Sequence, residues 1–428
     1  MTNSTPEQQD KAAAGSLPKE PELGVAGDEA AEAPAQAGAR GLGSRLVRDA
    51  SVKEALFAFC LTRIPLLVIF VLVGHLSFEG DGTGLGKLIQ DPIIYLGTQS
   101  QSLPEILVRG DSNRYITIAR EGYEHQPFST DQQYNWAFFP LQALLLRAVG
   151  SITGEYAVSG ALASNVLFFL VLVLLHKTTL EFGFDGPTAG RAVLYLAIFP
   201  VSYFFSLPLS ESLFLALTIG AFYAAQRQRW LAASLLGALA SAARVTGILL
   251  LPVFLLLYWQ RYEKWSRRDW LYLLLIPSGL ISFMIYLRAI TGNPLAFLDI
   301  QVAFGRESDY FLSPLVNYLS SWDTLAIPWD FRILNFAAAL MTFGCVYVLL
   351  KRRQFALGSY CFLSIAPPLF NTTLISFSRY AMVAFPVFIA LGLKGRSQWV
   401  DQIIRFLFIL LFGIMATLFA AHFSIALA

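Results

Sequence analysis

Long apolar runs separated by short polar segments make up the chain from about residue 50 to its end. A helix needs about 20 mainly apolar residues to cross a bilayer, and most of these runs come near that length. We therefore predict an all-α polytopic membrane protein with about eleven transmembrane helices. The predicted spans are 54–76, 158–177, 190–206, 208–226, 230–244, 246–260, 270–290, 333–350, 356–373, 380–394 and 402–423.

Basic clusters between the runs indicate the direction of each span, because Lys and Arg concentrate in cytoplasmic loops. The clusters at 176–177, 227–229, 261–268, 351–353 and 394–396 all become cytoplasmic only under one condition. The apolar run 230–259 must form two short spans that turn near Arg244. This arrangement puts the N-terminus in the cytoplasm and the C-terminus outside.

Three segments interrupt the apolar pattern. Residues 1–50 have almost no large apolar side chains and predict a disordered cytoplasmic tail ahead of a membrane domain at 51–428. Residues 79–157 form the first extracytoplasmic loop, with eight acidic and four basic residues between 79 and 131. Residues 291–332 form a second large outer loop. Within the first loop, 138–149 is too short to span and predicts an interfacial helix.

Composition narrows the function classes. The chain is 56% hydrophobic and 14% charged, whereas soluble proteins carry about 25% charged residues. With a net charge of +2, it has no field to attract nucleic acid. The four His and three Cys lack metal-ligand spacing, and there is no glycine-rich phosphate loop. We expect no metal, no cofactor and no nucleic-acid partner.

Two carboxylates are candidates for chemistry on the outer side. Asp111 begins a short amphipathic helix in the first loop, where it either caps the helix or acts as a base that deprotonates a hydroxyl nucleophile. Glu211 starts a long apolar span, where it either interacts with the helix dipole, with Ser210 as cap, or faces a polar cavity.

Two arginines lie near the same outer side. Arg244 and Arg379 either bind an anionic phosphate, or reach the interface or pair with a nearby acid. Arg63 and Arg191 lie closer to the cytoplasmic ends of their spans, and for them we favour snorkelling to the interface.

Four motifs, in order over residues 50–395, resemble PIG-V-like mannosyltransferases. They are Arg109-Gly110-Asp111-Ser112-Asn113-Arg114-Tyr115 with Asn135-Trp136-Ala137-Phe138-Phe139-Pro140-Leu141, then Phe199-Pro200…Phe204-Phe205-Ser206 with Ser210-Glu211-Ser212-Leu213-Phe214, then Ala243-Arg244-Val245-Thr246-Gly247, and finally Ser378-Arg379-Tyr380.

The resemblance implies a GT-C-like helical bundle with interfacial helices in the first outer loop and an extracytoplasmic active site. Such enzymes transfer sugar from a polyprenyl-phosphate donor, usually with inversion, to a glycan, glycolipid or protein acceptor. Asp111 maps to the family's catalytic base. The proposed substrate-binding residues are Arg114, Tyr115, Glu211, Arg244, Arg379 and Tyr380.

This sequence departs from the family pattern at two positions. Gly110 replaces a common Trp, and Arg114 stands where His or an aromatic residue is frequent. The loss of the Trp weakens a stacking role in sugar binding. A transporter or lipid-sugar flippase, with the same charged residues lining a path, is the rival interpretation. It predicts internal repeats and broken helices at mid-membrane; the sequence shows no repeat, and the polar groups gather at one face.

Overall fold

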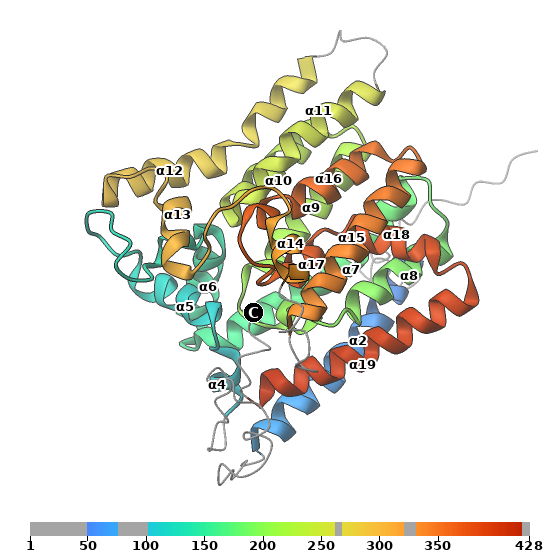
Figure 1. Cartoon of the computed structure of the whole chain (residues 1–428), viewed down its shortest axis with the longest axis horizontal. Coiled ribbons are helices and arrows are strands. Elements are labelled where there is room, and N and C mark those ends of the chain that lie inside the picture. Colours follow the sequence, from blue (N-terminus) through green and yellow to red (C-terminus); the bar gives the residue numbers. More distant parts are fainter. Residues whose placement is uncertain (1–48, 76–101, 262–267, 321–330, 422–428) are drawn as a thin grey trace, which may run out of the picture. The chain divides into compact units, whose positions relative to one another are not determined.

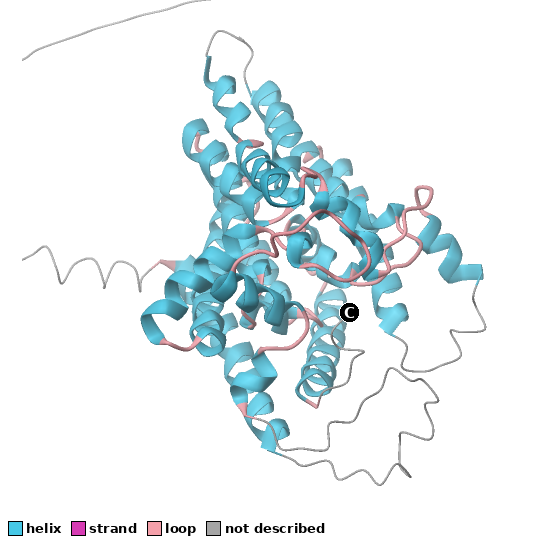
Figure 2. Ribbon diagram, turned by 90° about the vertical axis from the view of Figure 1, so that its left-hand side faces the viewer, coloured by secondary structure: helices cyan, strands magenta, loops and turns pink. Residues whose placement is uncertain are grey.

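The structure, a computed structural model, describes residues 49–75, 102–261, 268–320 and 331–421. The predicted tail, apart from its last two residues, and the predicted outer loop up to residue 101 lie outside the described residues. Figure 2 shows the described chain as helices joined by loops. Within it, the one pairing of extended backbone is an isolated bridge between Ser308 and Asn371. The predicted all-α class is confirmed.

The first half of the chain contains the long helix α2 and the helices of the first loop, followed by the central helices. Their bounds are α2 (Ala50–His75), α4 (Leu103–Leu107), α5 (Asp111–Glu121), η1 (Asn135–Ala137), α6 (Pro140–Thr153), α7 (Tyr156–Glu181), α8 (Gly186–Ala197), η2 (Ser202–Ser206), α9 (Ser210–Gln226), α10 (Trp230–Ala243), η3 (Val245–Leu249) and α11 (Leu250–Arg261).

The second half adds a pair of successive helices, a set of short helices and the C-terminal helices. Their bounds are η4 (Arg268–Leu275), α12 (Ser278–Thr291), α13 (Ala296–Asp299), η5 (Ile300–Phe304), α14 (Ser313–Ser320), α15 (Phe331–Lys351), α16 (Phe355–Ile365), η7 (Pro367–Phe370), α17 (Phe377–Val383), α18 (Pro386–Lys394) and α19 (Gln398–Ala420).

Five stretches of helix among the described residues are long and apolar enough to cross a membrane. They are Ala50–Gly74, Tyr156–Glu181, Arg268–Thr291, Ile333–Lys351 and Gln398–Ala420. Each coincides with a predicted span. In Figure 1 the first and last of them, α2 and α19, run side by side, and they pack against each other. The total of eleven spans stays a prediction.

Three predicted spans are not continuous helices. The span predicted at 190–206 breaks after Ala197, and the one at 356–373 breaks after Ile365. The span at 380–394 is split into α17 and α18, which meet at 82°. Pro386 is the first residue of α18, and a proline there cannot donate the amide hydrogen bond that would continue the preceding helix.

The break predicted near Arg244 is confirmed, since α10 ends at Ala243 and η3 follows. Gly247 explains the turn. A Cβ atom on it would lie 2.3 Å from the carbonyl carbon of Ala240, so only glycine lets the chain fold back this closely on α10. The Gly247 amide donates to the Arg244 carbonyl at 2.9 Å and closes the turn.

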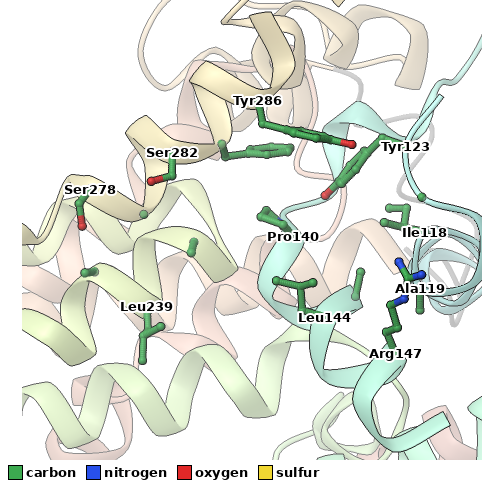
Figure 3. Close-up of a pocket in the computed structure, with 16 residues that line it drawn as sticks. Ile118, Ala119, Tyr123, Pro140, Leu144, Arg147, Leu239, Ser278, Ser282 and Tyr286 are labelled. Carbon is green, nitrogen blue, oxygen red and sulfur yellow. The ribbon is translucent and has the colours of Figure 1, made fainter. Parts of the chain in front are cut away.

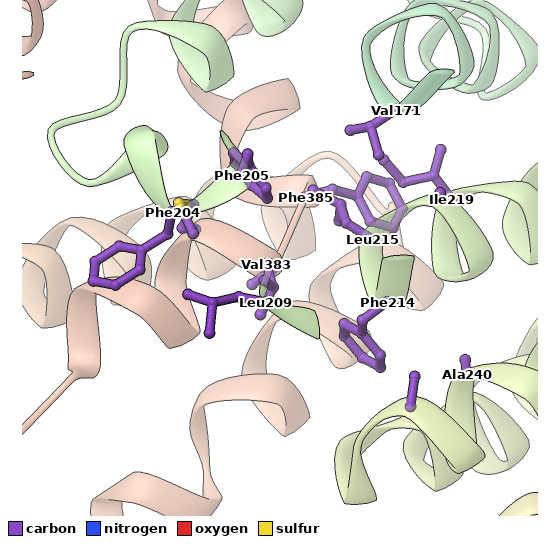
Figure 4. Close-up of a cluster of buried hydrophobic side chains, with 14 of the residues drawn as sticks. Val171, Phe204, Phe205, Leu209, Phe214, Leu215, Ile219, Ala240, Val383 and Phe385 are labelled. Atoms are coloured by element: carbon purple, nitrogen blue, oxygen red, sulfur yellow. The ribbon is translucent and has the colours of Figure 1, made fainter. Parts of the chain in front are cut away.

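A buried aromatic and aliphatic cluster lies at the centre of the fold and supports the start of α9. Figure 4 shows Phe204, Leu209, Phe214, Val383 and Phe385 contributed by η2, α9 and the α17–α18 bend. These five side chains are at most 3% exposed. The packing joins segments far apart in the sequence, so the first turn of α9 has little freedom to move.

The two longest helices within the described part of the predicted first loop are α5 and α6. The amphipathic helix expected to start at Asp111 is confirmed as α5, and the helix expected over 138–149 is α6, which begins at Pro140. The two pack against each other, and α6 also packs against α7 and α10. This places α5 beside the central helices.

Candidate active site

The Glu211 carboxylate is the centre of a buried charge cluster. Glu211 lies in the first turn of α9 with no exposed side-chain surface. Its Oε1 atom accepts from Arg379 Nε at 3.1 Å and Arg379 Nη2 at 2.6 Å, and lies 3.2 Å from Arg244 Nη1. The predicted Ser210 cap is wrong, because the N-cap residue is Leu209.

Asp111 joins the cluster from the first turn of α5. Its Oδ2 accepts from Arg379 Nη1 at 2.9 Å, so one guanidinium links two carboxylates that are 100 residues apart in the sequence. The Asp111 side chain is 41% exposed, against 10% for Arg379. Of the two carboxylates, Asp111 is therefore the one that a ligand can reach, because the Glu211 side chain has no exposed surface.

The helix-cap interpretation of Asp111 is wrong. The N-cap of α5 is Gly110, Asp111 is the first helical residue, and no side-chain cap bond forms. Gly110 has φ 57° and ψ −129°, a conformation essentially reserved for glycine. A Trp at position 110, the common residue in the family pattern, would strain this backbone turn, which lies directly before Asp111.

Two contacts and one backbone turn hold Arg379 in place. The Ser378 amide, at the start of α17, donates to Asn335 Oδ1 of α15 at 2.8 Å. Ser376, the N-cap residue of α17, has φ 61°, a left-handed backbone conformation that is uncommon for a residue other than glycine. On the other side, the Arg379 guanidinium lies 4.5 Å from the centre of the Phe204 ring. Arg379 is thus fixed from α15, α17 and η2.

Arg244 approaches Glu211 from the break between α10 and η3. Its Nη1 lies 3.5 Å from Ser210 Oγ, and its guanidinium lies 5.8 Å from the Phe214 ring and 5.9 Å from the Tyr380 ring. The side chain is 19% exposed and contacts Glu211 through one nitrogen. More of its hydrogen-bonding capacity is therefore free for a ligand than that of Arg379.

Tyr115 lies one turn after Asp111 on α5 and shares a hydrogen bond with Ser210. Burial raises the pKa of the Tyr115 hydroxyl to about 12, so the group stays protonated at physiological pH. Arg114 is half-buried on the same helix and forms no hydrogen bond or ion pair within the described part of the chain.

The charges of the cluster balance, with Asp111 and Glu211 opposite Arg244 and Arg379. Glu211 Oε2 is buried and accepts no hydrogen bond from the residues that the structure describes. Across those residues, no group of three His, Cys, Asp or Glu side chains has the geometry of a metal site. A neutral cluster with one open carboxylate and one accessible guanidinium suits proton transfer beside an anionic group.

An apolar cavity of about 500 Å³ lies between α5, α6, α10 and α12. Ile118 and Ala119 of α5, together with Gly122 directly after the helix, line one wall, on the helix face that also carries Tyr115. Ala242 lines another wall, two residues before Arg244. Figure 3 shows Tyr123 and Tyr286 facing each other at one end. The cavity therefore follows the same two segments that supply Tyr115 and Arg244.

The comparison with family models decides the affiliation. Residues 54–291, more than half of the chain, match the family described as Mannosyltransferase (PIG-V). The chain belongs to this family. The matched region contains Asp111, Glu211 and Arg244, while Arg379 lies beyond it and joins them only in three dimensions. With its apolar helices, this member of the family is a multi-pass membrane protein.

Three solved structures of the oligosaccharyltransferase of Archaeoglobus fulgidus are also similar. The form tethered to an acceptor peptide matches with 14% identity over 85% of this chain and 55% of that chain, at a TM-score of 0.40. The apo form matches with 13% identity over 84% of this chain and 56% of that chain, at a TM-score of 0.43. The complex with an inhibitory peptide and a dolichol-phosphate matches with 13% identity over 85% of this chain and 55% of that chain, at a TM-score of 0.36.

The chain spans little more than half the length of these archaeal structures. Their TM-scores all lie below 0.5, so the overlap carries no argument about activity. None of the curated proteins matches the chain. The affiliation therefore depends on the family model.

The structure brings six of the seven candidate residues together. Asp111, Tyr115, Glu211, Arg244, Arg379 and Tyr380 are linked by the contacts described above, and Arg114 lies beside them without such a contact. Arg244 and Arg379 both pair with a nearby acid, and phosphate binding by either stays a prediction. Sequence reasoning missed Phe204, although its motif had been singled out.

The predicted snorkelling of Arg63 and Arg191 is wrong. Arg63 is 7% exposed and donates to backbone and serine oxygens inside the protein. Arg191 donates through Nε to the Gly392 carbonyl at 2.8 Å and thereby connects α8 to α18. Arg63 therefore satisfies acceptors in the protein interior, where a lipid headgroup cannot compete, while the half-buried Arg191 is held by a neighbouring helix.

Proposed function

We propose that this family member is a membrane mannosyltransferase that moves a sugar from a polyprenyl-phosphate donor to an acceptor hydroxyl. The acceptor is a glycan, a glycolipid or a protein, and the reaction inverts the anomeric centre without a nucleotide. One observation carries the proposal. Asp111, Glu211, Arg244 and Arg379, from four separate elements, form a single charge-balanced cluster in which Asp111 is open.

Asp111 is the proposed base. Its carboxylate takes the proton of the acceptor hydroxyl as that oxygen attacks the anomeric carbon of the donor sugar. The bond between that carbon and the phosphate oxygen breaks, and its electron pair leaves with the lipid phosphate. A positioned base of this kind typically contributes about 10²- to 10⁴-fold in rate.

The two arginines have different proposed roles. All three guanidinium nitrogens of Arg379 contact carboxylates, so this side chain orients Asp111 beside Glu211. Arg244 is more accessible and contacts Glu211 through one nitrogen. We assign it to the donor phosphate, whose charge grows as the sugar leaves. Arg114, Tyr115 and Tyr380 complete the sugar-binding surface.

The apolar cavity suits the lipid part of the donor. Its walls are mainly small and aliphatic side chains from α5, α6, α10 and α12, and it follows the segments that carry Tyr115 and Arg244. A polyprenyl chain in this cavity would place its phosphate near Arg244. This account explains why a sugar-transfer site is built at the edge of membrane-spanning helices.

The proposed topology follows the charge pattern of the sequence. The tail at 1–50 is cytoplasmic, the membrane domain at 51–428 carries the activity, and the loops at 79–157 and 291–332 lie on the extracytoplasmic side. The proposed active site then faces away from the cytoplasm. In this topology the bundle is a GT-C-like arrangement with α5 and α6 as the interfacial helices.

The direct test incubates purified protein with polyprenyl-phosphate [³H]mannose and membrane extract, and identifies the labelled product. Transfer of label to an acceptor, with release of polyprenyl phosphate, supports the proposal. Translocation of intact donor across proteoliposomes, with no new glycoside, supports the transporter interpretation instead. Parallel incubations with polyprenyl-phosphate glucose and galactose determine the sugar.

A further inference from the structure

Arg63 is a buried cation near the middle of α2, a helix long and apolar enough to cross a membrane. Its guanidinium faces the interior of the bundle and is 7% exposed. A charge in this position is costly, and ionisable groups within spans usually have a definite task. The proposed transfer mechanism makes no use of Arg63.

The Arg63 guanidinium binds one short segment of chain. Nη1 donates to the Ser202 carbonyl at 2.9 Å and to Ser206 Oγ at 3.0 Å. Nη2 donates to the Ala197 carbonyl at 3.2 Å and to Ser202 Oγ at 2.9 Å. The four acceptors surround the turn that leads from the end of α8 through η2.

Arg63 has no carboxylate partner among the described residues. Aromatic faces add to the stabilisation, since the guanidinium lies 4.4 Å from the Phe168 ring and 5.9 Å from the Phe412 ring. A planar fork that bridges four acceptors needs arginine. A lysine ammonium carries the same charge but cannot reach all four oxygens from one point.

The segment bound by Arg63 also supports the candidate active site. Phe204 lies between Ser202 and Ser206 in η2, and the Arg379 guanidinium lies 4.5 Å from its ring. Directly after η2, Ser212 Oγ donates to the Phe205 carbonyl at 2.8 Å and connects the turn to the first turn of α9. The turn is thus held by Arg63 on one side and contacts Arg379 and the Glu211 segment on the other.

We propose that Arg63 is a positioning residue for sugar transfer. It fixes the η2 turn so that Phe204 supports Arg379 in the orientation that bridges Asp111 and Glu211. This role rests on the proposed function, because it acts through the proposed base. Arg63 itself touches neither donor nor acceptor, so its loss is expected to lower kcat while the KM for the donor stays within about threefold.

The test compares Arg63→Met with Arg191→Met in the purified full-length protein. Arg191 is a matched control, since it also joins helices by donating to a backbone carbonyl, but it contacts Gly392 and Thr188 away from the cluster. Hydrogen exchange measured by mass spectrometry reports on the amides of 199–207, and steady-state kinetics report kcat and KM.

We expect Arg63→Met to raise amide exchange at 199–207 and to lower kcat by up to about 100-fold, the loss that a 1 Å misplacement can cause. Arg191→Met is expected to change neither the amide exchange at 199–207 nor kcat. Phe204→Leu combined with Arg63→Met should lower kcat little more than either change alone, because both act through one contact. Additive losses would overturn the proposed route through Phe204.

Ser202→Ala keeps the Arg63 side chain and removes one acceptor, so it tests the same link if Arg63→Met fails to fold. Unchanged exchange at 199–207 in both variants would overturn the proposal, as would raised exchange with unchanged kcat. The exchange measurement does not depend on turnover. If the wild-type protein transfers no sugar from any donor, the proposed function fails, while the exchange result still decides whether Arg63 holds the turn.

Discussion

Replacement of Glu211 by Gln removes the charge that the buried Arg379 and the partly exposed Arg244 share. The carboxylate has no exposed surface and meets Arg379 and Arg244 through three nitrogen contacts of 2.6–3.2 Å. In the variant only the partly exposed Asp111 opposes the two cations. Breaking a buried pair from one side typically costs about 3–5 kcal/mol, so we expect a loss of stability in this range.

The second half of the same prediction is the double variant Glu211→Gln with Arg379→Gln. It removes one charge of each sign, so the cluster keeps Asp111 opposite Arg244. If each single change costs about 3–5 kcal/mol, the double change is expected to cost well below the sum, with a coupling of up to about 3 kcal/mol. Removing both partners of a buried pair is far less costly than removing one.

Unfolding free energies in mixed micelles of fixed composition measure this coupling. Glu181→Gln is the control, because its pair with Arg227 is 3.4 Å long and largely exposed, and such pairs contribute about 0–1 kcal/mol. If Glu211→Gln loses no more than this control, or the single losses simply add, then Glu211 is not the shared counter-charge and the site as described is wrong.

Three further outcomes can be measured on the same protein. Gly247→Ala is expected to destabilise it by about 1–3 kcal/mol, because the new Cβ meets the Ala240 backbone at 2.3 Å, while Gly344→Ala, where nothing lies within 4 Å, is expected to cause no loss and to stabilise by up to about 1 kcal/mol in the same unfolding measurement, because Ala is favoured over Gly inside a helix. Tyr115→Phe is expected to leave the pH–rate profile unchanged in shape from pH 7 to 10, since burial raises the pKa of Tyr115 to about 12 and its neutral form persists throughout; an alkaline limb that disappears in the variant would contradict this. Ala242→Phe is expected to raise the KM of a long-chain donor about tenfold, or about 1.4 kcal/mol, and to spare a ten-carbon donor that does not fill the cavity; equal effects on both donors would remove the cavity from the account.

Local patterns were sufficient for several elements of this fold. The five stretches of helix that are long and apolar enough to cross a membrane coincide with apolar runs, because length and hydropathy alone define a span. The helix that starts at Asp111 follows from apolar positions three and four residues apart, and the break at Arg244 follows from the charge pattern of the flanking loops. The family motifs also pointed to six residues that prove to be neighbours.

Features that depend on distant contacts could not be predicted in this way. The Arg63 acceptors lie more than 130 residues away, so a single sequence favoured the interface over the interior. The 82° bend between α17 and α18 places Arg379 beside Glu211, whereas hydropathy indicated one continuous span. The role of Gly110 in the turn before Asp111 could be recognised only from its φ and ψ angles, which the sequence does not give.

The central claim is that Asp111 removes the proton of the acceptor hydroxyl, and single-turnover transfer from polyprenyl-phosphate mannose tests it most directly. Asp111→Asn keeps the shape of the side chain, and Asp131→Asn is the matched control, since Asp131 is an exposed aspartate of the same loop that bonds to Ser129 and Tyr134. The account predicts that Asp111→Asn binds donor as the wild type does but transfers at least about 100-fold more slowly, while Asp131→Asn transfers normally. Transfer by Asp111→Asn at the wild-type rate would contradict it.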